Sequence, residues 1–325
     1  MDVKVLICRD YDICVLLSII FQLDFHFFNW NFDNDISGLL MTKDRLASSM
    51  EPTPTIHLTG VLEGLGDDFV TKLIHDEFEV TIEKDQLVRI SNKLELELTH
   101  LSAGLKAVRL ADITPNDIVI HFSTNHKVSD LFVEIADLCP SILVTTGLNS
   151  QPKHLEFVDT IIDINDLIPS TNCKHFQSNN LDQMLQLCYL RDTGGFQSDL
   201  PARYWWLSQQ DAVTGLVGLV NCRSLPRGVV PMCGRREWSL SDTFDQLSML
   251  YQRTLAGASG QFSLNHLQPS PVIGAGVQKV TDVIVGKRPD LSNLHEVMLE
   301  SNEAGWRPLV PLRTSLMYYL AAKLE

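Results

Sequence analysis

Short apolar runs alternate with helical patterns over the middle of the chain, at the spacing of βαβ units. Two of these runs, 118–120 and 142–144, are continuous, which is typical of parallel strands buried on both faces. The pattern predicts strands at 55–59, 79–83, 106–110, 117–122, 141–145 and 186–191. Helices are predicted between several of them, at 67–75, 94–103, 128–138 and 181–185.

This alternation predicts an α/β fold, with residues 50–195 as one doubly wound, Rossmann-like domain around a parallel sheet. After residue 195 the pattern loosens, so residues 196–325 are expected to form a smaller, loop-rich part interleaved with the first. Helical spacing returns at 211–220, and again from an N-cap at Ser239 or Ser241 through residue 250. A final helix is predicted at 312–324.

Residues 1–49 fit no part of this pattern. Their apolar stretch, 13–28, is interrupted by Asp24 and His26 and is too short for a membrane span. It also lacks the basic segment and small-residue cleavage site of a secretory signal. We expect no membrane segment here, and we interpret residues 1–49 as an extension, with Met50 as the natural start.

Three closely spaced glycines follow the first predicted strand, in the sequence Thr-Ile-His-Leu-Thr-Gly-Val-Leu-Glu-Gly-Leu-Gly. Glycines at 60, 64 and 66 allow a tight turn and a close approach of a phosphate to the backbone before the helix at 67–75. Free N–H groups at a helix N-terminus bind anions. The segment therefore indicates a dinucleotide site at Thr59, Gly60, Gly64, Leu65 and Gly66, although a structural turn without ligand has the same pattern.

Composition narrows the classes of partner. The net charge of −14 and the absence of a basic run argue against nucleic acid. The seven cysteines are scattered without a Cys-x-x-Cys pair, so no metal site is expected. Free thiols at irregular spacing are typical of a reducing compartment, and we predict a cytoplasmic protein.

With these landmarks in place, the chain resembles the extended branch of the short-chain dehydrogenase/reductase superfamily, which holds nucleotide-sugar epimerases and dehydratases. Thr59-Gly60 resembles the start of the family's glycine turn, and Asp112-Ile113 resembles its contact to adenine. The strand that ends in His121 would lie beside the nicotinamide. The strand that ends in Thr145 and Thr146 would carry the catalytic hydroxyl.

The second half of the chain adds matches in the family's order. Cys233-Gly234 precedes a Trp-Ser-Leu helix start, and Gly305-Trp306-Arg307-Pro308 precedes the last helix. Arg288-Pro289-Asp290 resembles the element that contacts the nucleotide part of the substrate, with Arg288 as the binding residue. The resemblance implies NAD or NADP as cofactor and a nucleotide-linked sugar, or another small alcohol or ketone, as substrate.

The family's chemistry uses a tyrosine and, four residues later, a lysine that lowers the pKa of the tyrosine. On a helix predicted over 174–181, His175 falls in the tyrosine's place and Asn179 in that of the lysine. Histidine can move protons near neutral pH, but asparagine supplies no charge. The literal pair, Tyr319 and Lys323, lies on the terminal helix and is interpreted as structural.

Acidic residues alter the predicted cofactor site as well. Glu63, Asp67 and Asp68 crowd the place where a pyrophosphate would lie. Acids at a helix start stabilise the helix by about 0.3–1 kcal/mol each, but they would repel a bound pyrophosphate. Glu83 after the second strand favours NAD over NADP, and the adjacent Lys84 keeps NADP open.

Two hypotheses follow. One is an NAD(P)-dependent epimerase or dehydratase in which Thr145 or Thr146 orients the substrate and His175 is the acid and base. The other, which the missing Tyr-Lys pair favours, is a catalytically inactive Rossmann scaffold or regulatory protein without cofactor. The resemblance also implies a homodimer, with the helix at 128–138 as a candidate interface.

Overall fold

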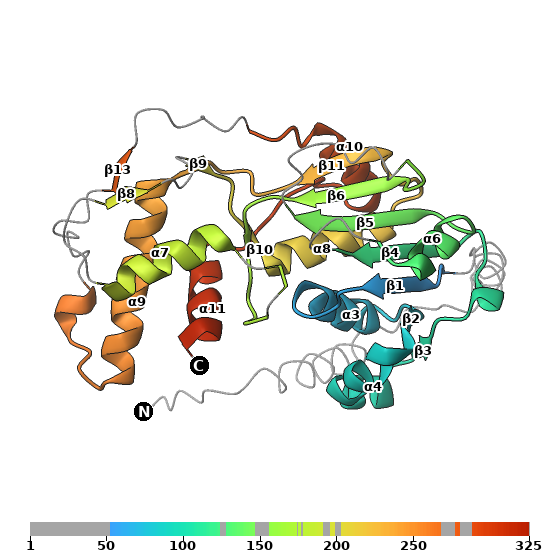
Figure 1. Cartoon of the computed structure of the whole chain (residues 1–325), viewed down its shortest axis with the longest axis horizontal. Coiled ribbons are helices and arrows are strands. Elements are labelled where there is room, and N and C mark those ends of the chain that lie inside the picture. The colour runs from blue at the N-terminus through green and yellow to red at the C-terminus, as the bar shows by residue number, and fades with distance from the viewer. Residues whose placement is uncertain are drawn as a thin grey trace, which may run out of the picture. The chain divides into compact units, whose positions relative to one another are not determined.

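The computed structural model describes residues 53–324 except 124–127, 147–155, 174, 177, 191–195, 199–202, 268–276 and 280–287. Its centre is a seven-stranded parallel sheet in the order β11-β6-β5-β4-β1-β2-β3 (Figure 1). The strands are β1 (Ile56–Gly60), β2 (Val80–Ile82), β3 (Leu105–Ala107), β4 (Ile118–Phe122), β5 (Ser141–Thr146), β6 (Thr160–Ile164) and β11 (Gly228–Met232). The strand order reverses between β1 and β4, where doubly wound folds bind their ligands.

Helices cover both faces of the sheet. On one face, α3 (Leu65–His75), α8 (Gln209–Val220) and α10 (Ser292–Ser301) share one buried apolar cluster with residues of the central strands. On the other face, α6 (Asp130–Ala136) packs Phe132 and Ile135 against Val119 and Leu143. The strands are therefore buried on both sides, as their continuous apolar runs predict.

A three-helix bundle forms a second apolar core. It consists of α7 (Asn179–Leu190), α9 (Leu240–Ala258) and α11 (Leu312–Leu324). Short ribbons connect to it, and they pair β7 (Leu167–Ile168) with β10 (Leu207–Ser208), β9 (Arg203–Tyr204) with β12 (Trp238–Ser239), and β8 (Phe196–Ser198) with β13 (Val277–Lys279). The remaining described elements are α4 (Lys84–Lys93), α5 (Glu95–His100) and the 3-10 turns η2 (Leu110–Asp112) and η3 (Leu264–Leu267).

The α/β, Rossmann-like fold class is confirmed, and the predicted strands are present except the last. Residues 186–191 were predicted as a strand, but residues up to Leu190 belong to α7. There Leu181, Met184, Leu185 and Cys188 recur at helical spacing and are buried, so tertiary packing selects the helix.

Several elements escaped prediction because they break the simple pattern. β6 contains Asp163, and β11 contains Pro231, which an edge strand tolerates. The predicted helix at 94–103 is the short α5, preceded by the unpredicted α4. Because β11 belongs to the second half of the chain and completes the sheet, the two halves are interleaved; the boundary at residue 195 stays a prediction.

No helix in the described ranges has the length and apolar character that a membrane crossing requires.

Candidate functional site

The glycine turn lies at the switch point, between the ends of β1 and β4. Gly60 has a φ of 83°, and a side chain there would collide with the carbonyl of Phe122 and the ring of His121. Val61 N donates to the Phe122 carbonyl at 2.9 Å, so the turn stays attached to β4. Gly64, with a φ of 75°, is the N-cap of α3, and Leu65 and Gly66 form its first turn. The predicted turn is thus present at the predicted place.

The carboxylate of Glu83 binds the backbone of the glycine turn. Its Oε1 accepts the Gly60 N–H at 2.8 Å, while Gln86 Nε2 donates to the Gly60 carbonyl at 2.7 Å. Both residues come from the start of α4, with Glu83 as its N-cap. In this arrangement the carboxylate expected to accept bonds from a ribose is engaged by backbone.

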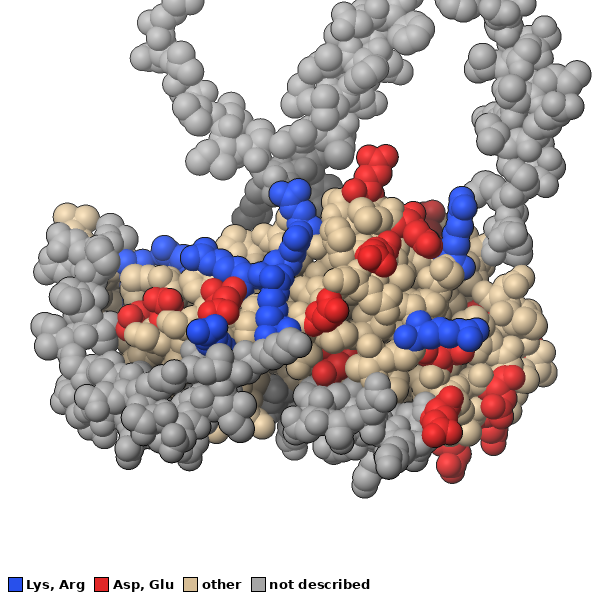
Figure 2. Space-filling view, turned by 90° about the horizontal axis from the view of Figure 1, so that it is seen from above, with Lys and Arg blue, Asp and Glu red and all other residues tan. Residues whose placement is uncertain are grey.

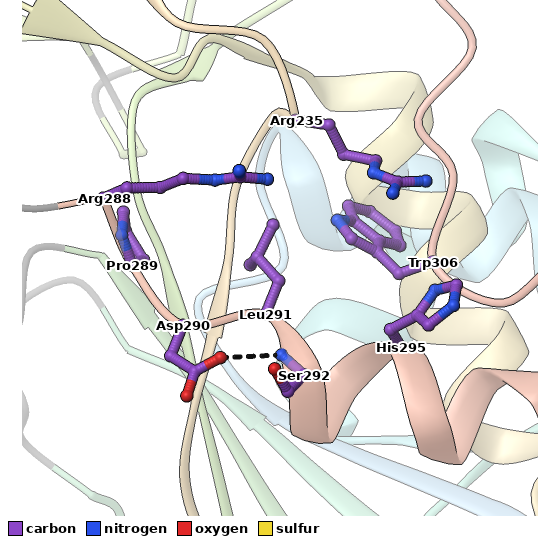
Figure 3. A pocket seen from close by; sticks show the side chains of 8 residues that line it. All are labelled: Arg235, Arg288, Pro289, Asp290, Leu291, Ser292, His295 and Trp306. Atoms are coloured by element: carbon purple, nitrogen blue, oxygen red, sulfur yellow. Dashed lines mark hydrogen bonds between the residues drawn. The ribbon is translucent and has the colours of Figure 1, made fainter.

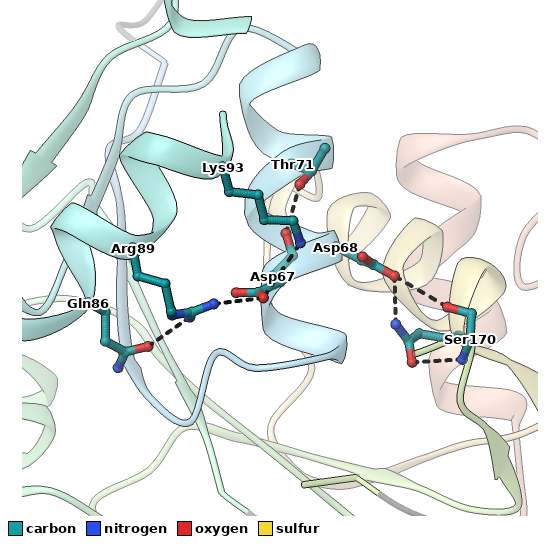
Figure 4. Close-up of polar contacts among 8 residues, drawn as sticks. Asp67, Asp68, Thr71, Gln86, Arg89, Lys93 and Ser170 are labelled. Carbon is teal, nitrogen blue, oxygen red and sulfur yellow. Dashed lines mark hydrogen bonds and ion pairs between the residues drawn. The ribbon is translucent and has the colours of Figure 1, made fainter. Parts of the chain in front are cut away.

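The two aspartates at the start of α3 also have protein partners (Figure 4). Asp67 Oδ2 lies 2.8 Å from Arg89 Nη1 and 3.5 Å from Lys93 Nζ, both on α4. This hydrogen bond raises the pKa of Arg89. Asp68 accepts hydrogen bonds from Gln209 of α8 and from Ser170. The two carboxylates therefore fasten the helix start to its neighbours.

Residues 170–173, 175 and 176, which we call the covering segment, lie against the turn. A Cβ on Gly64 would be 2.5 Å from Cys173 Sγ and 3.3 Å from Thr171 Oγ1. The Phe176 ring meets the Phe122 ring edge-on, with centroids 6.2 Å apart, and is only 3% exposed. The chain thus fills part of the crevice between β1 and β4.

These contacts allow a test of whether the turn fits a dinucleotide. A pyrophosphate would need the space above Gly64 and the first N–H groups of α3. Cys173 lies against Gly64, and the adjoining cavity, about 640 Å³, is lined by Gly64 itself together with Glu63, Asp67 and Lys93. The topology is that of a dinucleotide site, and the covering segment narrows the space beside its glycine turn.

Other predicted residues gather at the same edge of the sheet. Thr59 Oγ1 lies 2.8 Å from His121 Nδ1, and both side chains are buried. The His121 ring packs on Phe132, with centroids 4.8 Å apart. Thr145 is fully buried at the end of β5, whereas Thr146 is half-buried. The structure brings Thr59 and His121 together and places Thr145 and Thr146 at the end of the neighbouring strand β5. The catalytic or cofactor-binding roles of these residues stay predictions.

The helix predicted over 174–181 begins only at Asn179. His175 therefore lies before it, in the covering segment, where it lines the cavity beside Gly64. The sequence spacing of His175 and Asn179 consequently does not place them on one helix face. Phe176 has a φ of 55° and a buried ring, so its backbone cannot continue a helix, which periodicity alone could not indicate.

The pair Tyr319 and Lys323 joins two helices of the bundle. The Tyr319 hydroxyl donates to Asp182 Oδ1 at 2.6 Å, and Lys323 Nζ lies 2.9 Å from the same oxygen. Burial, together with Asp182, raises the pKa of Tyr319, which is the reverse of activation. The structural interpretation of this pair therefore fits the contacts.

The predicted adenine contact, Asp112 and Ile113, follows β3. Asp112 is exposed at the end of η2, and Ile113 is half-buried against the cluster around α6. Within the described residues, no group of histidine, cysteine, aspartate or glutamate side chains is arranged to hold a metal ion.

Arg288 lines a separate cavity of about 470 Å³, shown in Figure 3. Arg235, from the loop after β11, extends into the same cavity beside Trp306, whose Nε1 donates to the Cys233 carbonyl at 3.0 Å. Asp290 is turned to the backbone N–H of Ser292, 3.0 Å away. In the part of the chain described, neither arginine has an ion-pair partner, so two guanidinium groups are available to an anion.

The sequence analysis named Arg288 as a binding residue, which stays a prediction, and it did not name Arg235. The signal was the adjacent Cys233-Gly234 element, which places Arg235 directly after the end of β11. Figure 2, the view from above Figure 1, shows Lys and Arg side chains adjoining one another near the middle of that face. Positive charge is thus locally concentrated although the chain carries −14.

No model of a known protein family matches the sequence, and no curated protein sequence matches it. Solved structures do match. The enzyme WbmG of Bordetella bronchiseptica, in complex with NAD, has a TM-score of 0.50 at 13% identity, over 84% of this chain and 95% of that one. The UDP-glucuronic acid 4-epimerase of Bacillus cereus, in complex with UDP-glucuronic acid and NAD, has a TM-score of 0.49 at 12% identity, over 83% and 100%.

The similarity to the Bordetella enzyme concerns the fold, since the sequences are nearly unrelated. The chain therefore has the Rossmann-like fold of the NAD-bound Bordetella enzyme, which is the fold that its resemblance to extended short-chain dehydrogenases/reductases implied.

Proposed function

We propose that this protein is a relative of the nucleotide-sugar epimerases and dehydratases that binds a nucleotide-linked sugar without nicotinamide redox chemistry. The observation that carries the proposal is the covering segment. Its Cys173 lies against Gly64 at the start of α3, beside the place where a dinucleotide would need to bring its pyrophosphate.

The catalytic residues support the same conclusion. Proton transfer coupled to hydride transfer needs a phenol of lowered pKa held by a nearby cation. Asn179 supplies no charge, and His175 lies outside α7. Among the described residues, Tyr319 is followed by a lysine four residues later, but its pKa is raised and its hydroxyl donates to the carboxylate of Asp182.

The Arg235–Arg288 cavity supports the binding part of the proposal. Guanidinium groups bind diphosphates through paired, charge-assisted hydrogen bonds. The cavity volume of about 470 Å³ lies within the range of small-molecule sites. Because the resemblance implies a nucleotide-linked sugar as substrate, uridine diphosphate sugars are the first ligands to examine.

Calorimetric titration of the full chain tests both parts. We expect no heat of binding with NAD⁺, NADH, NADP⁺ or NADPH up to about 1 mM, and saturable binding of UDP-glucose or UDP-glucuronic acid. Arg288→Gln should weaken that binding about tenfold, since a hydrogen-bonded charge contributes roughly 1.5–3 kcal/mol. Arg307→Gln is the matched control, because this exposed arginine does not line the cavity.

Two results would contradict the proposal. Micromolar binding of any of the four dinucleotides would show that the turn opens for a cofactor. Equal affinity of the wild type and Arg288→Gln for the nucleotide sugar would remove the assigned binding residue.

One observation favours the alternative, an active NAD-dependent enzyme. His175 borders the cavity beside Gly64, close to where the chemistry of such a fold takes place. In that case Thr145 or Thr146 orients the substrate and Glu83 selects NAD over NADP. The His175→Ala variant is then expected to lose turnover of a nucleotide sugar or another alcohol. Unchanged turnover in His175→Ala would exclude this role.

The predicted homodimer and the cytoplasmic location also stay proposals. The helix α6 is the candidate interface, and light scattering of the purified full chain would give the mass of the particle. A monomer at micromolar concentration would exclude a stable dimer.

A further inference from the structure

A third cavity, of about 400 Å³, lies beside the N-terminus of α11. Its apolar lining includes Ile168, Trp206 and Leu312, each less than a tenth exposed, and the half-buried Trp238. These side chains belong to the edge of the three-helix bundle and its ribbons. The described lining thus includes aromatic and aliphatic side chains, a combination that suits a ring system.

The rim of this cavity is basic. The Arg236 guanidinium lies 4.1 Å from the centroid of the Trp238 ring, in the stacked geometry of a cation–π contact. Arg313, in the first turn of α11, also borders the cavity. Across the described residues neither arginine enters an ion pair. The positive end of the α11 dipole adds to their field.

The nearby acids are engaged elsewhere. Glu237, between Arg236 and Trp238 in sequence, pairs with Arg203 at 3.3 Å. Asp211, the only acid among the described residues that line the cavity, accepts the Leu309 N–H at 2.8 Å and the Ser208 hydroxyl at 2.7 Å. Both of its oxygens are thereby used by the protein. Among the described residues that line the cavity, no second carboxylate faces Arg236 and Arg313.

From this arrangement we infer that the cavity binds a small aromatic carboxylate. The ring lies on the apolar surface beside Trp206 and Trp238, and the carboxylate lies between Arg236 and Arg313 at the start of α11. Stacking on Trp238 already orders the Arg236 side chain, which lowers the entropy lost when it binds an anion. This cavity has Arg235 in common with the Arg288 cavity, but its other described lining residues are different. The inference does not rest on the proposed function.

The probe for this site is naphthalene-2-carboxylate, titrated calorimetrically into the full chain. We expect saturable binding of one equivalent, at least about tenfold weaker binding of naphthalene-2-carboxamide, and no displacement by UDP-glucose. Arg236→Gln and Arg313→Gln should each lower the affinity for naphthalene-2-carboxylate about tenfold. Arg307→Gln, an exposed arginine on the same segment that does not border the cavity, should bind like the wild type.

Circular dichroism of each variant confirms that it is folded, so that a loss of binding is interpretable. The inference is overturned if folded wild-type protein shows no saturable binding up to about 1 mM. It is also overturned if the carboxamide binds as tightly as the carboxylate, or if both arginine variants bind like the wild type. Weaker binding in Arg288→Gln, together with displacement by UDP-glucose, would place the probe in the other cavity and likewise refute it.

Discussion

Replacing Phe176 measures how firmly the covering segment is held on the glycine turn. Phe176 is 3% exposed, packs on Phe122, and has a φ of 55°, in the left-handed region that side chains disfavour. Two substitutions separate these properties. Phe176→Ala removes the ring and keeps the backbone penalty, whereas Phe176→Gly removes both.

The magnitude follows from the burial. A phenylalanine ring buries roughly 150–250 Å², which at about 25 cal/mol per Å² gives about 4–6 kcal/mol as an upper bound. Measured Phe→Ala substitutions in cores cost about 3–5 kcal/mol. The left-handed conformation costs a residue with a side chain about 1–2 kcal/mol, and glycine avoids most of this cost. We therefore expect Phe176→Ala to lose about 3–5 kcal/mol and Phe176→Gly to lose about 1 kcal/mol less.

Urea denaturation of the full chain, followed by tryptophan fluorescence, gives the free energies of unfolding. The matched control is Phe132, which is fully buried within the helix α6. There the order reverses, because glycine within a helix is about 1 kcal/mol worse than alanine. If Phe176→Ala stays within about 1 kcal/mol of the wild type, or if glycine is the worse substitution at both sites, the segment is not held as described and the reasoning fails.

Three further predictions concern the framework. Ser239→Ala should lower the free energy of unfolding by about 1 kcal/mol, because Ser239 Oγ accepts the Asp242 N–H at 3.0 Å as the N-cap of α9. Ser241→Ala, at the exposed second residue of the helix, should lower it little, and equal losses in urea denaturation would contradict the N-cap assignment. Asp211→Ala should lose about 3–5 kcal/mol, since it leaves the Leu309 and Val310 N–H groups without their acceptor, and Asp211→Asn should recover part of this in the same assay. Burial lowers the pKa of His57, against a smaller raising effect of Asp117, so the unfolded chain binds protons more readily than the folded one. The stability of the fold should therefore decrease as the pH drops below about 6.5. His57→Gln should flatten the dependence of the melting temperature on pH between about pH 5 and 7, and an unchanged dependence would refute this prediction.

Local sequence determined much of the framework. The continuous runs at Ile118–Phe122 and Ser141–Thr146 became buried parallel strands because only a sheet covered on both faces accommodates them. The turn at Gly60 and Gly64 and the terminal helix Leu312–Leu324 formed where local pattern placed them. Each of these depends on residues that are neighbours along the chain.

The tertiary structure decided what the site contains. Cys173 meets Gly64, Gln209 meets Asp68, and Arg235 meets the cavity of Arg288, each across a long separation in sequence. The strand predicted at 186–191 became helix for the same kind of reason, since the bundle core buries one face of α7. Such contacts depend on how distant elements pack, and no local period or propensity encodes them. The sequence alone therefore determined a dinucleotide-type turn, and the packing of a distant segment determined what covers it.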